Sequence, residues 1–157
     1  MKLKDLFEKW GLKGLKVKTP IMDMEWVPND PDKAAAWDMY VELLTRITTQ
    51  ELPDEAGVEA TALESVYALF PLTRETLKTH GRGCVAFSRL AIVILNQIIR
   101  PFTAKWHKKS DNRAFSNETN RKEFRKDLKA LQEKLIRYTR LLGTVADIEE
   151  DLIDIEQ

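Results

Sequence analysis

One stretch of the sequence, residues 81–107, constrains the fold more than any other. It contains the longest apolar run of the chain, at 90–95, with further apolar residues on either side. At about 100° per residue these positions cover most of the circumference of a helix, so the stretch predicts a buried central helix over about 82–100. Pro101 follows, and we expect this proline to end or kink the helix.

The polar residues of the predicted central helix share one side. Arg89, Asn96 and Arg100 are spaced seven and four residues apart, which places them on one stripe of a helix, with Gln97 beside it. This stripe could be the solvent side of a buried helix, a polar network inside the protein or a surface that another chain covers. Because buried polar side chains need partners, the pattern favours a groove or an interface over a dry core.

The beginning of the chain predicts a short helix followed by an extended arm. Apolar residues at helical spacing indicate a helix over residues 3–10, ended by Gly11, which would dock on the domain or on a partner. We expect the residues up to 29 to form an arm that lies along a groove. Asp30 and Pro31 then mark the next helix, as its N-cap and its first helical residue.

The most regular pattern lies in residues 118–142. Apolar residues recur there at alternating spacings of four and three, at Phe124, Leu128, Leu131, Leu135, Tyr138 and Leu142. Such a heptad pattern suits a coiled coil between two chains, or one long helix that packs on its own bundle. We favour packing within the chain and keep dimerisation as the alternative. Gly143 is expected to cap this helix, and Thr144 to start a final acidic helix.

These patterns together predict an all-α fold, a single-domain bundle of about five or six helices over residues 1–157. We expect a short helix and an extended N-terminal arm in 1–29 and a helical core in 30–107. A solvated loop is expected at 107–119, followed by the heptad helix and the acidic helix in 118–157.

Composition excludes several classes of site. The chain has one cysteine, Cys84, and two histidines, His80 and His107, so we expect no internal disulfide, no metal site and no bound cofactor. Its first residues are too short and too charged for a signal peptide, and we found no apolar stretch of the roughly 20 residues that a membrane span needs. A cytoplasmic protein without a membrane span is the prediction.

The net charge is zero, but the charges are sorted along the chain. Residues 1–18 carry six lysines and two acids, 19–65 eleven acids and two bases, and 66–104 five bases and one acid. Residues 105–140 carry twelve bases and five acids, and 141–157 six acids and no base. This sorting could give a basic patch for phosphates, or acidic and basic segments that neutralise one another, which we favour.

Arg100 and His107 form the one candidate catalytic spacing. The pattern Arg-x6-His resembles the motif of HEPN domains, compact helical bundles that often act as metal-independent ribonucleases; Arg74 and His80 repeat it loosely. The resemblance covers the central helix and the turn after it. It implies that His107 transfers a proton and Arg100 stabilises phosphate charge, with the residues of two protomers meeting across a dimer interface.

The same two residues also have a structural interpretation. Arg100 would then pair with an acid such as Glu42 or Glu64, and His107 would be an exposed loop residue. Neither role requires any chemistry.

Several residues beside this motif are candidates for binding. Lys105, Lys108 and Lys109 could attract phosphates, and Trp106 could offer a face on which a base stacks. Trp26 and Trp106 are both predicted on irregular segments beside charges, which makes them candidate anchors of an interface.

Three hypotheses for function follow. The preferred one is a non-catalytic helical subunit of a larger cytoplasmic assembly, which contacts another protein or a second copy through the arm at 19–30, the heptad helix and the charged ends. The combination of an acidic arm with a tryptophan, a buried helix that leads to residues 100–107 and two charged C-terminal helices resembles small helical accessory proteins of bacterial antiviral defence operons. The alternatives are a HEPN-like metal-independent ribonuclease and a non-catalytic RNA- or DNA-binding module that uses residues 105–129.

Overall fold

A computed structural model describes residues 1–53 and 58–156 of the chain. These residues form an all-α single domain with buried central helices, as the sequence predicts, and without strands. The helices are α1 (Leu3–Lys9), α2 (Thr19–Met22), α3 (Asp30–Leu44), α4 (Glu59–Tyr67), α5 (Leu69–His80), α6 (Val85–Ile94), α7 (Arg100–Asp111) and α8 (Glu118–Val145). Short 3₁₀ turns lie at Gly81–Gly83, Ala114–Ser116 and Leu152–Asp154.

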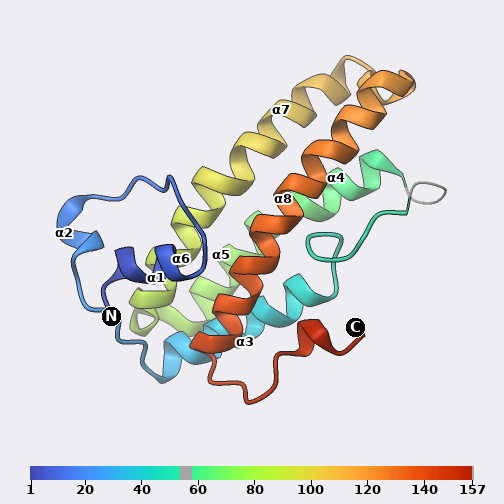
Figure 1. Cartoon of the computed structure of the whole chain (residues 1–157). Helices are drawn as coiled ribbons and strands as arrows, with labels where there is room; N and C mark the ends of the chain where they lie inside the picture. The colour runs from blue at the N-terminus through green and yellow to red at the C-terminus, as the bar shows by residue number, and fades with distance from the viewer. Residues whose placement is uncertain (54–57, 157) are drawn as a thin grey trace.

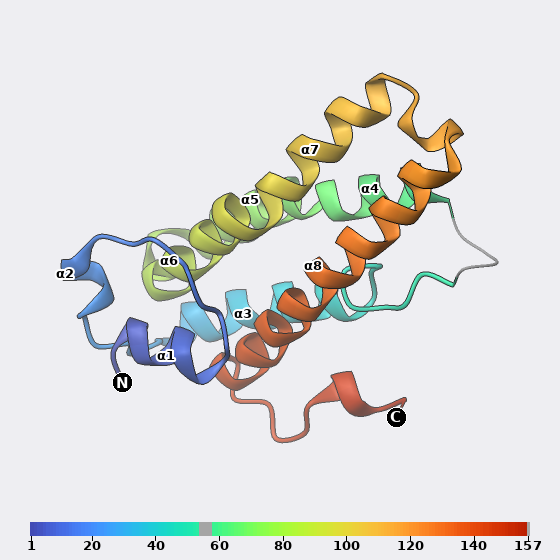
Figure 2. The same ribbon diagram turned by 45° about the horizontal axis from the view of Figure 1, so that its top comes forward.

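Helix α3 lies against three other helices and organises the bundle. It packs on α8, α5 and α6, while α7 contacts α4 and α8. Figures 1 and 2 show the run from α6 to α7 and helix α8 as two long rods that extend side by side beyond α3. The largest side chains buried between these elements are Tyr40, Phe87, Leu90, Ile94, Ile99, Trp106, Phe124 and Leu128.

The sequence predicted that the central helix ends or kinks at Pro101, and the structure shows that it does not end there. A π-helical segment, Leu95–Ile99, joins α6 to α7, and the amide of Arg100 donates to the carbonyl of Leu95. Pro101 therefore lies in the first turn of α7. Proline has no backbone N–H to donate to the carbonyl four residues earlier, and the wider π turn before it accommodates the missing hydrogen bond. The helix runs on to Asp111, so the predicted loop at 107–119 is helical in its first part.

The continuous helix Val85–Asp111 also corrects an expectation about membranes. By length and composition alone it could cross one, although we found no such stretch in the sequence. The core helix of a water-soluble protein can be as long and as apolar, and this helix is partly buried in the domain. It is therefore weak evidence for a membrane span.

Helix α1 docks on its own domain through three buried residues, Leu3, Leu6 and Phe7. The arm that follows is not fully extended, because it contains α2, and it folds back beside the start of the chain. The amide of Trp26 donates to the carbonyl of Met1 at 2.7 Å. The arm thus lies on this chain, beside its first residues.

Helix α8 packs within the chain. All six heptad residues named above are buried in the domain. The end of the helix differs from the prediction: Gly143 lies inside α8, which continues to Val145. Within the described residues 146–156, the predicted acidic helix is reduced to the 3₁₀ turn Leu152–Asp154. A Cβ at Gly143 would meet the side chains of Ile148 at 2.9 Å and Tyr40 at 3.0 Å, so glycine serves here for close packing and not as a cap.

Candidate functional site

The helix from α6 to α7 is buried along one side and open along the other. We define the exposed stripe as the residues on its open side, which are Val85, Arg89, Ile92, Asn96, Arg100, Ala104 and Lys108. All are exposed except Arg89, which is half-buried. Val85 and Ile92 each expose 47% of their surface, so the open side has apolar as well as polar residues. The stripe is the longest open face of this helix.

The π segment keeps the stripe in line. Members of the stripe are four residues apart from Ile92 onward, and a regular helix of 3.6 residues per turn would rotate such residues steadily away from one another. The longer period of the π turn offsets this rotation between Ile92 and Arg100. Arg89, Asn96 and Arg100 accordingly lie on one side, as their spacing predicts.

Arg100 is held by neutral partners. Its guanidinium donates through Nε and Nη2 to Oδ1 of Asn96, at 3.1 and 3.0 Å, and its Cζ lies 4.7 Å from the centre of the Phe70 ring. The structure contains no ion pair between Arg100 and either Glu42 or Glu64 among the residues described. The positive charge is therefore positioned but not neutralised.

His107 faces α4, whereas Arg100 lies against Phe70 of α5. It lies in α7 and not in a loop, with Nε2 at 3.4 Å from Oε1 of Glu64 and its ring edge-on to Tyr67 at 4.8 Å between centroids. Tyr67 also contacts Phe70, at 5.6 Å. Seven helical residues correspond to about 10 Å, so Arg100 and His107 lie near the same aromatic pair without touching each other.

The aromatic pair of Tyr67, the last residue of α4, and Phe70, in the first turn of α5, was not predicted from the sequence. Phe70 is buried, but Tyr67 is 45% exposed. The second Arg-x-His spacing has a structural role, since Nε2 of His80 lies 2.6 Å from Oδ2 of Asp38. It is not part of the stripe.

The lysines that were predicted to bind phosphate divide into two groups. Lys105 lies at 2.9 Å from Glu123 and 2.7 Å from Asp127, and Lys109 lies at 3.3 Å from Glu123. Hydrogen bonds to these carboxylates raise the pKa of Lys105, and hydrogen bonds from the two lysines lower the pKa of Glu123. Of these three lysines, only Lys108 forms no ion pair with a described residue, and it belongs to the exposed stripe.

Trp106 is fully buried, so the face that was predicted to stack on a base or anchor an interface is not available. Its Nε1 donates to Asp127 at 3.1 Å, and its ring packs between Phe115 and Phe124. Phe115 lies in the segment that was predicted to be a solvated loop, and its ring stacks on the indole of Trp106. An aromatic residue in that segment was the sequence feature that could have indicated this burial.

Gln97 fastens the N-terminal arm. Its side-chain amide accepts from the backbone N–H of Lys16 at 2.7 Å and donates to the carbonyl of the same residue at 2.6 Å. A residue predicted to bind a partner therefore binds this chain, and it fixes one border of the exposed stripe.

Trp26 and Arg89, 63 positions apart in the sequence, line the same hollow. It has a volume of about 360 Å³ and opens between the arm, the start of α3 and the start of α6. Arg82 and Val85 also line it. The hollow thus extends the exposed stripe at its N-terminal end with one half-buried tryptophan and a second arginine.

The charged residues of the segment that carries the stripe are all basic, although Glu25 and Asp32 line the hollow at its N-terminal end. Residues 76–110 contain no acid. We call six bases of this region and of α5 the unpaired bases, since none forms an ion pair within the described part of the chain: Arg74, Lys78, Arg82, Arg89, Arg100 and Lys108. The basic excess at 105–140 is partly neutralised within the fold, while that at 66–104 is not.

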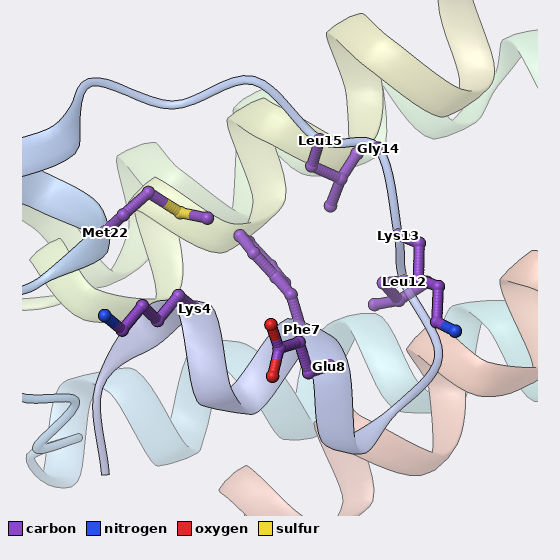
Figure 3. Close-up of a pocket in the computed structure, with 8 residues that line it drawn as sticks. All are labelled: Lys4, Phe7, Glu8, Leu12, Lys13, Gly14, Leu15 and Met22. Carbon is purple, nitrogen blue, oxygen red and sulfur yellow. The ribbon is translucent and has the colours of Figure 1, made fainter.

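A separate hollow lies beneath the loop after α1 (Figure 3). Its volume is about 450 Å³, and the ring of Phe7 and the side chain of Met22 point toward each other across it. Lys4, at its rim, is directed to Asp23 at 3.0 Å. Because its polar groups do not converge, this hollow offers no chemistry comparable to the stripe.

Within residues 1–53 and 58–156 no three His, Cys, Asp or Glu side chains are placed to hold a metal ion. No protein-family model matches the chain, and no curated protein or solved structure is significantly similar to it. What the site can do is therefore argued from its geometry.

Proposed function

We propose that this chain is a non-catalytic helical interaction subunit that uses the exposed stripe as its docking surface. One observation carries the proposal: the stripe places Val85 and Ile92, each 47% exposed, in line with Arg89, Arg100 and Lys108. Apolar side chains flanked by positioned arginines are the composition of a protein interface.

Two of the surfaces considered from the sequence, the heptad helix and the N-terminal arm, are already covered within the chain. The heptad face of α8 is buried in the domain, α1 rests on its own core, and the arm is tied to Gln97 and to the first residues. We therefore assign the contact with a partner to the central helix, and not to the heptad helix or the N-terminal arm. The earlier alternative of a stripe that another chain covers is the one that this geometry supports.

A charged substitution in the stripe tests the proposal. The full chain, purified from the cells that normally produce it, is compared with Ile92→Asp and with Val41→Asp, which changes an exposed β-branched residue of α3. We expect the wild type and Val41→Asp to retain the same stoichiometric partner or self-complex, and Ile92→Asp to lose it. Equal retention by both variants, or a wild type that forms no complex, contradicts the proposal.

A second candidate is a HEPN-like metal-independent ribonuclease. The observation that favours it is that Arg100 and His107 both lie along α7 beside Tyr67 and Phe70, with Glu64 next to the imidazole. The imidazole could move a proton and the arginine could hold phosphate charge. Because the two residues are about 10 Å apart along one helix, this chemistry requires those of a second protomer.

Cleavage of RNA in EDTA separates the two candidates. Wild type is assayed beside Arg100→Ala and His107→Ala, with Arg74→Ala and His80→Ala as controls of similar sequence spacing. The interaction subunit predicts no cleavage by any folded protein and an unchanged complex in His107→Ala. Cleavage that disappears only in the Arg100 and His107 variants would establish the ribonuclease instead.

A further inference from the structure

We propose that the exposed stripe binds the acidic segment 147–156 of a second copy of this chain, in a head-to-tail contact. The inference rests on the proposed function, because it names the partner of that docking surface. It is carried by the complementarity of two faces of the same molecule, each of which is open in the structure.

The basic face combines charge with apolar surface. Arg82, Arg89 and Arg100 are unpaired bases, and Val85 and Ile92 lie between them along the helix. Residues 76–110 contain no acid, and the acids nearest to Arg82 and Arg89 are Glu25 and Asp32, which line the same hollow from neighbouring elements. A partner that fits this face has carboxylates at intervals and at least one apolar side chain between them.

The segment 147–156 has this composition. Residues 141–157 contain six acids and no base. Glu149, Glu150 and Glu156 are exposed and form no ion pair among the residues described. Ile155, between Asp154 and Glu156, is 72% exposed, so this acidic surface also presents an apolar side chain.

The segment cannot reach the stripe of its own chain. Arg140 donates to Asp151 at 3.0 Å and to Asp154 at 2.7 Å, and the hydroxyl of Tyr40 donates to Asp151 at 2.6 Å. These bonds hold the segment beside α3 and the end of α8. In both Figure 1 and Figure 2, α8 lies between this segment and the run from α6 to α7. Neutralisation of the stripe by the segment must therefore occur between molecules.

The geometry also specifies the kind of assembly. The two faces are different surfaces, so a contact between them is heterologous and leaves one face free on each member of a pair. Such contacts continue into rings or open chains of molecules. A symmetric dimer would instead bury the same surface on both copies.

A protein occupant fits the stripe better than a nucleic acid does. Phosphates would satisfy the arginines but would leave Val85 and Ile92 without a partner. The acidic segment offers carboxylates to the arginines and Ile155 to the apolar residues. Binding of a single-stranded RNA homopolymer is accordingly an outcome that the experiment must exclude.

The test is sedimentation of the full chain over a range of concentrations, at about 50 mM and about 500 mM salt. We expect the wild type to grow beyond a dimer with concentration at low salt and to dissociate at high salt. The variants Arg89→Glu/Arg100→Glu and Glu150→Lys/Glu156→Lys should each associate about tenfold or more weakly. Lys126→Glu/Lys129→Glu, which reverses two exposed charges on α8, is the matched control and should associate like the wild type.

Mixing the two weakened variants gives the decisive result. The intact face of each variant fits the intact face of the other, and the two reversed faces also carry opposite charges, so an equimolar mixture should associate again, while neither variant associates alone. Circular dichroism and urea unfolding of each variant show that the fold is kept. If a variant does not fold, the concentration and salt dependence of the wild type still decides the matter.

Three results would overturn the inference. They are a wild type that stays monomeric at low salt, a dimer that is insensitive to salt, and folded variants whose mixture remains monomeric. Salt-dependent binding of poly(U) by a monomer, lost on reversal of Arg89 and Arg100, would assign the stripe to nucleic acid instead. A monomeric wild type whose native complex is still abolished by Ile92→Asp would overturn this inference and leave the proposed function intact.

Discussion

The carboxylate of Asp32 accepts a hydrogen bond from the backbone amide of Phe87 at 2.8 Å, and so joins the first turns of α3 and α6. Its other oxygen accepts from the amide of Asn29 at 2.9 Å, and Asn29, not Asp30, is the N-cap of α3. The first amides of a helix have no partner within the helix. One carboxylate thus satisfies amides at the beginnings of two helices and fixes the base of the exposed stripe.

We predict that Asp32→Ala destabilises the protein by about 2–4 kcal/mol, because two amides lose their acceptor and one of them is buried. Asp32 is 1% exposed, so water does not readily replace it. Asp30→Ala, in the same turn but exposed, should change the free energy of unfolding by less than about 1 kcal/mol. Urea unfolding measures both. Equal effects would show that the link to Phe87 contributes little.

The heptad seam of α8 should behave as core and not as a dimer interface. Leu135 is fully buried within the domain. Leu135→Ala should lower the free energy of unfolding by about 2–5 kcal/mol, and Ile136→Ala, at the half-buried neighbour, by clearly less. At about 500 mM salt, where the contact between the exposed stripe and the acidic segment is screened, the urea midpoint of Leu135→Ala should not depend on protein concentration. A midpoint that rises with concentration would indicate a seam shared between chains.

Gly143→Ala should destabilise the protein although alanine favours helix. The added Cβ would meet Cδ1 of Ile148 at 2.9 Å and the ring of Tyr40 at 3.0 Å, and Tyr40 is fully buried. Overpacking of this kind costs about 1–3 kcal/mol, against a helix gain of about 1 kcal/mol. Thr144→Ala, at an exposed position, serves as the comparison in thermal unfolding. A Gly143→Ala protein that melts higher than the wild type would refute the close packing.

The alkaline stability of the protein should depend on Tyr40. Burial, with a hydrogen bond to Asp151, raises the pKa of Tyr40 to about 12. A raised pKa means that the fold favours the protonated phenol, so its contribution is complete below the ordinary value of about 10 and is lost as the pH rises through 12. The difference in free energy of unfolding between wild type and Tyr40→Phe should therefore shrink above about pH 10. Urea unfolding at a series of pH values measures it; a constant difference would contradict the expectation.

Local periodicity accounts for much of what was predicted. The apolar run at 90–95, the heptads of α8 and the spacing of Arg89, Asn96 and Arg100 all concern residues within a few helical turns, where helix geometry alone relates one side chain to the next. The passage of the helix through Pro101 was missed because a π turn depends on how the neighbouring helices pack, which a local pattern does not record.

The candidate site was predicted only in outline for the same reason. Lys105 and Lys109 look like phosphate ligands in the sequence, but Glu123 and Asp127 on the adjacent helix neutralise them. Gln97 looks like a ligand of a partner, but it bonds to Lys16, 81 positions earlier. Which charges remain open is decided by which helices become neighbours.

The sequence by itself determined that this protein is an all-α bundle around one apolar helix with a polar stripe, because the periodicity of side chains along a helix is a local property. Tertiary structure decided which surfaces stay open. It buried Trp106, closed the seam of α8 and placed the acidic segment 147–156 across α8 from the stripe. Burial and charge neutralisation depend on contacts between residues distant in the chain, and these contacts left the bases of the stripe exposed beside Val85 and Ile92.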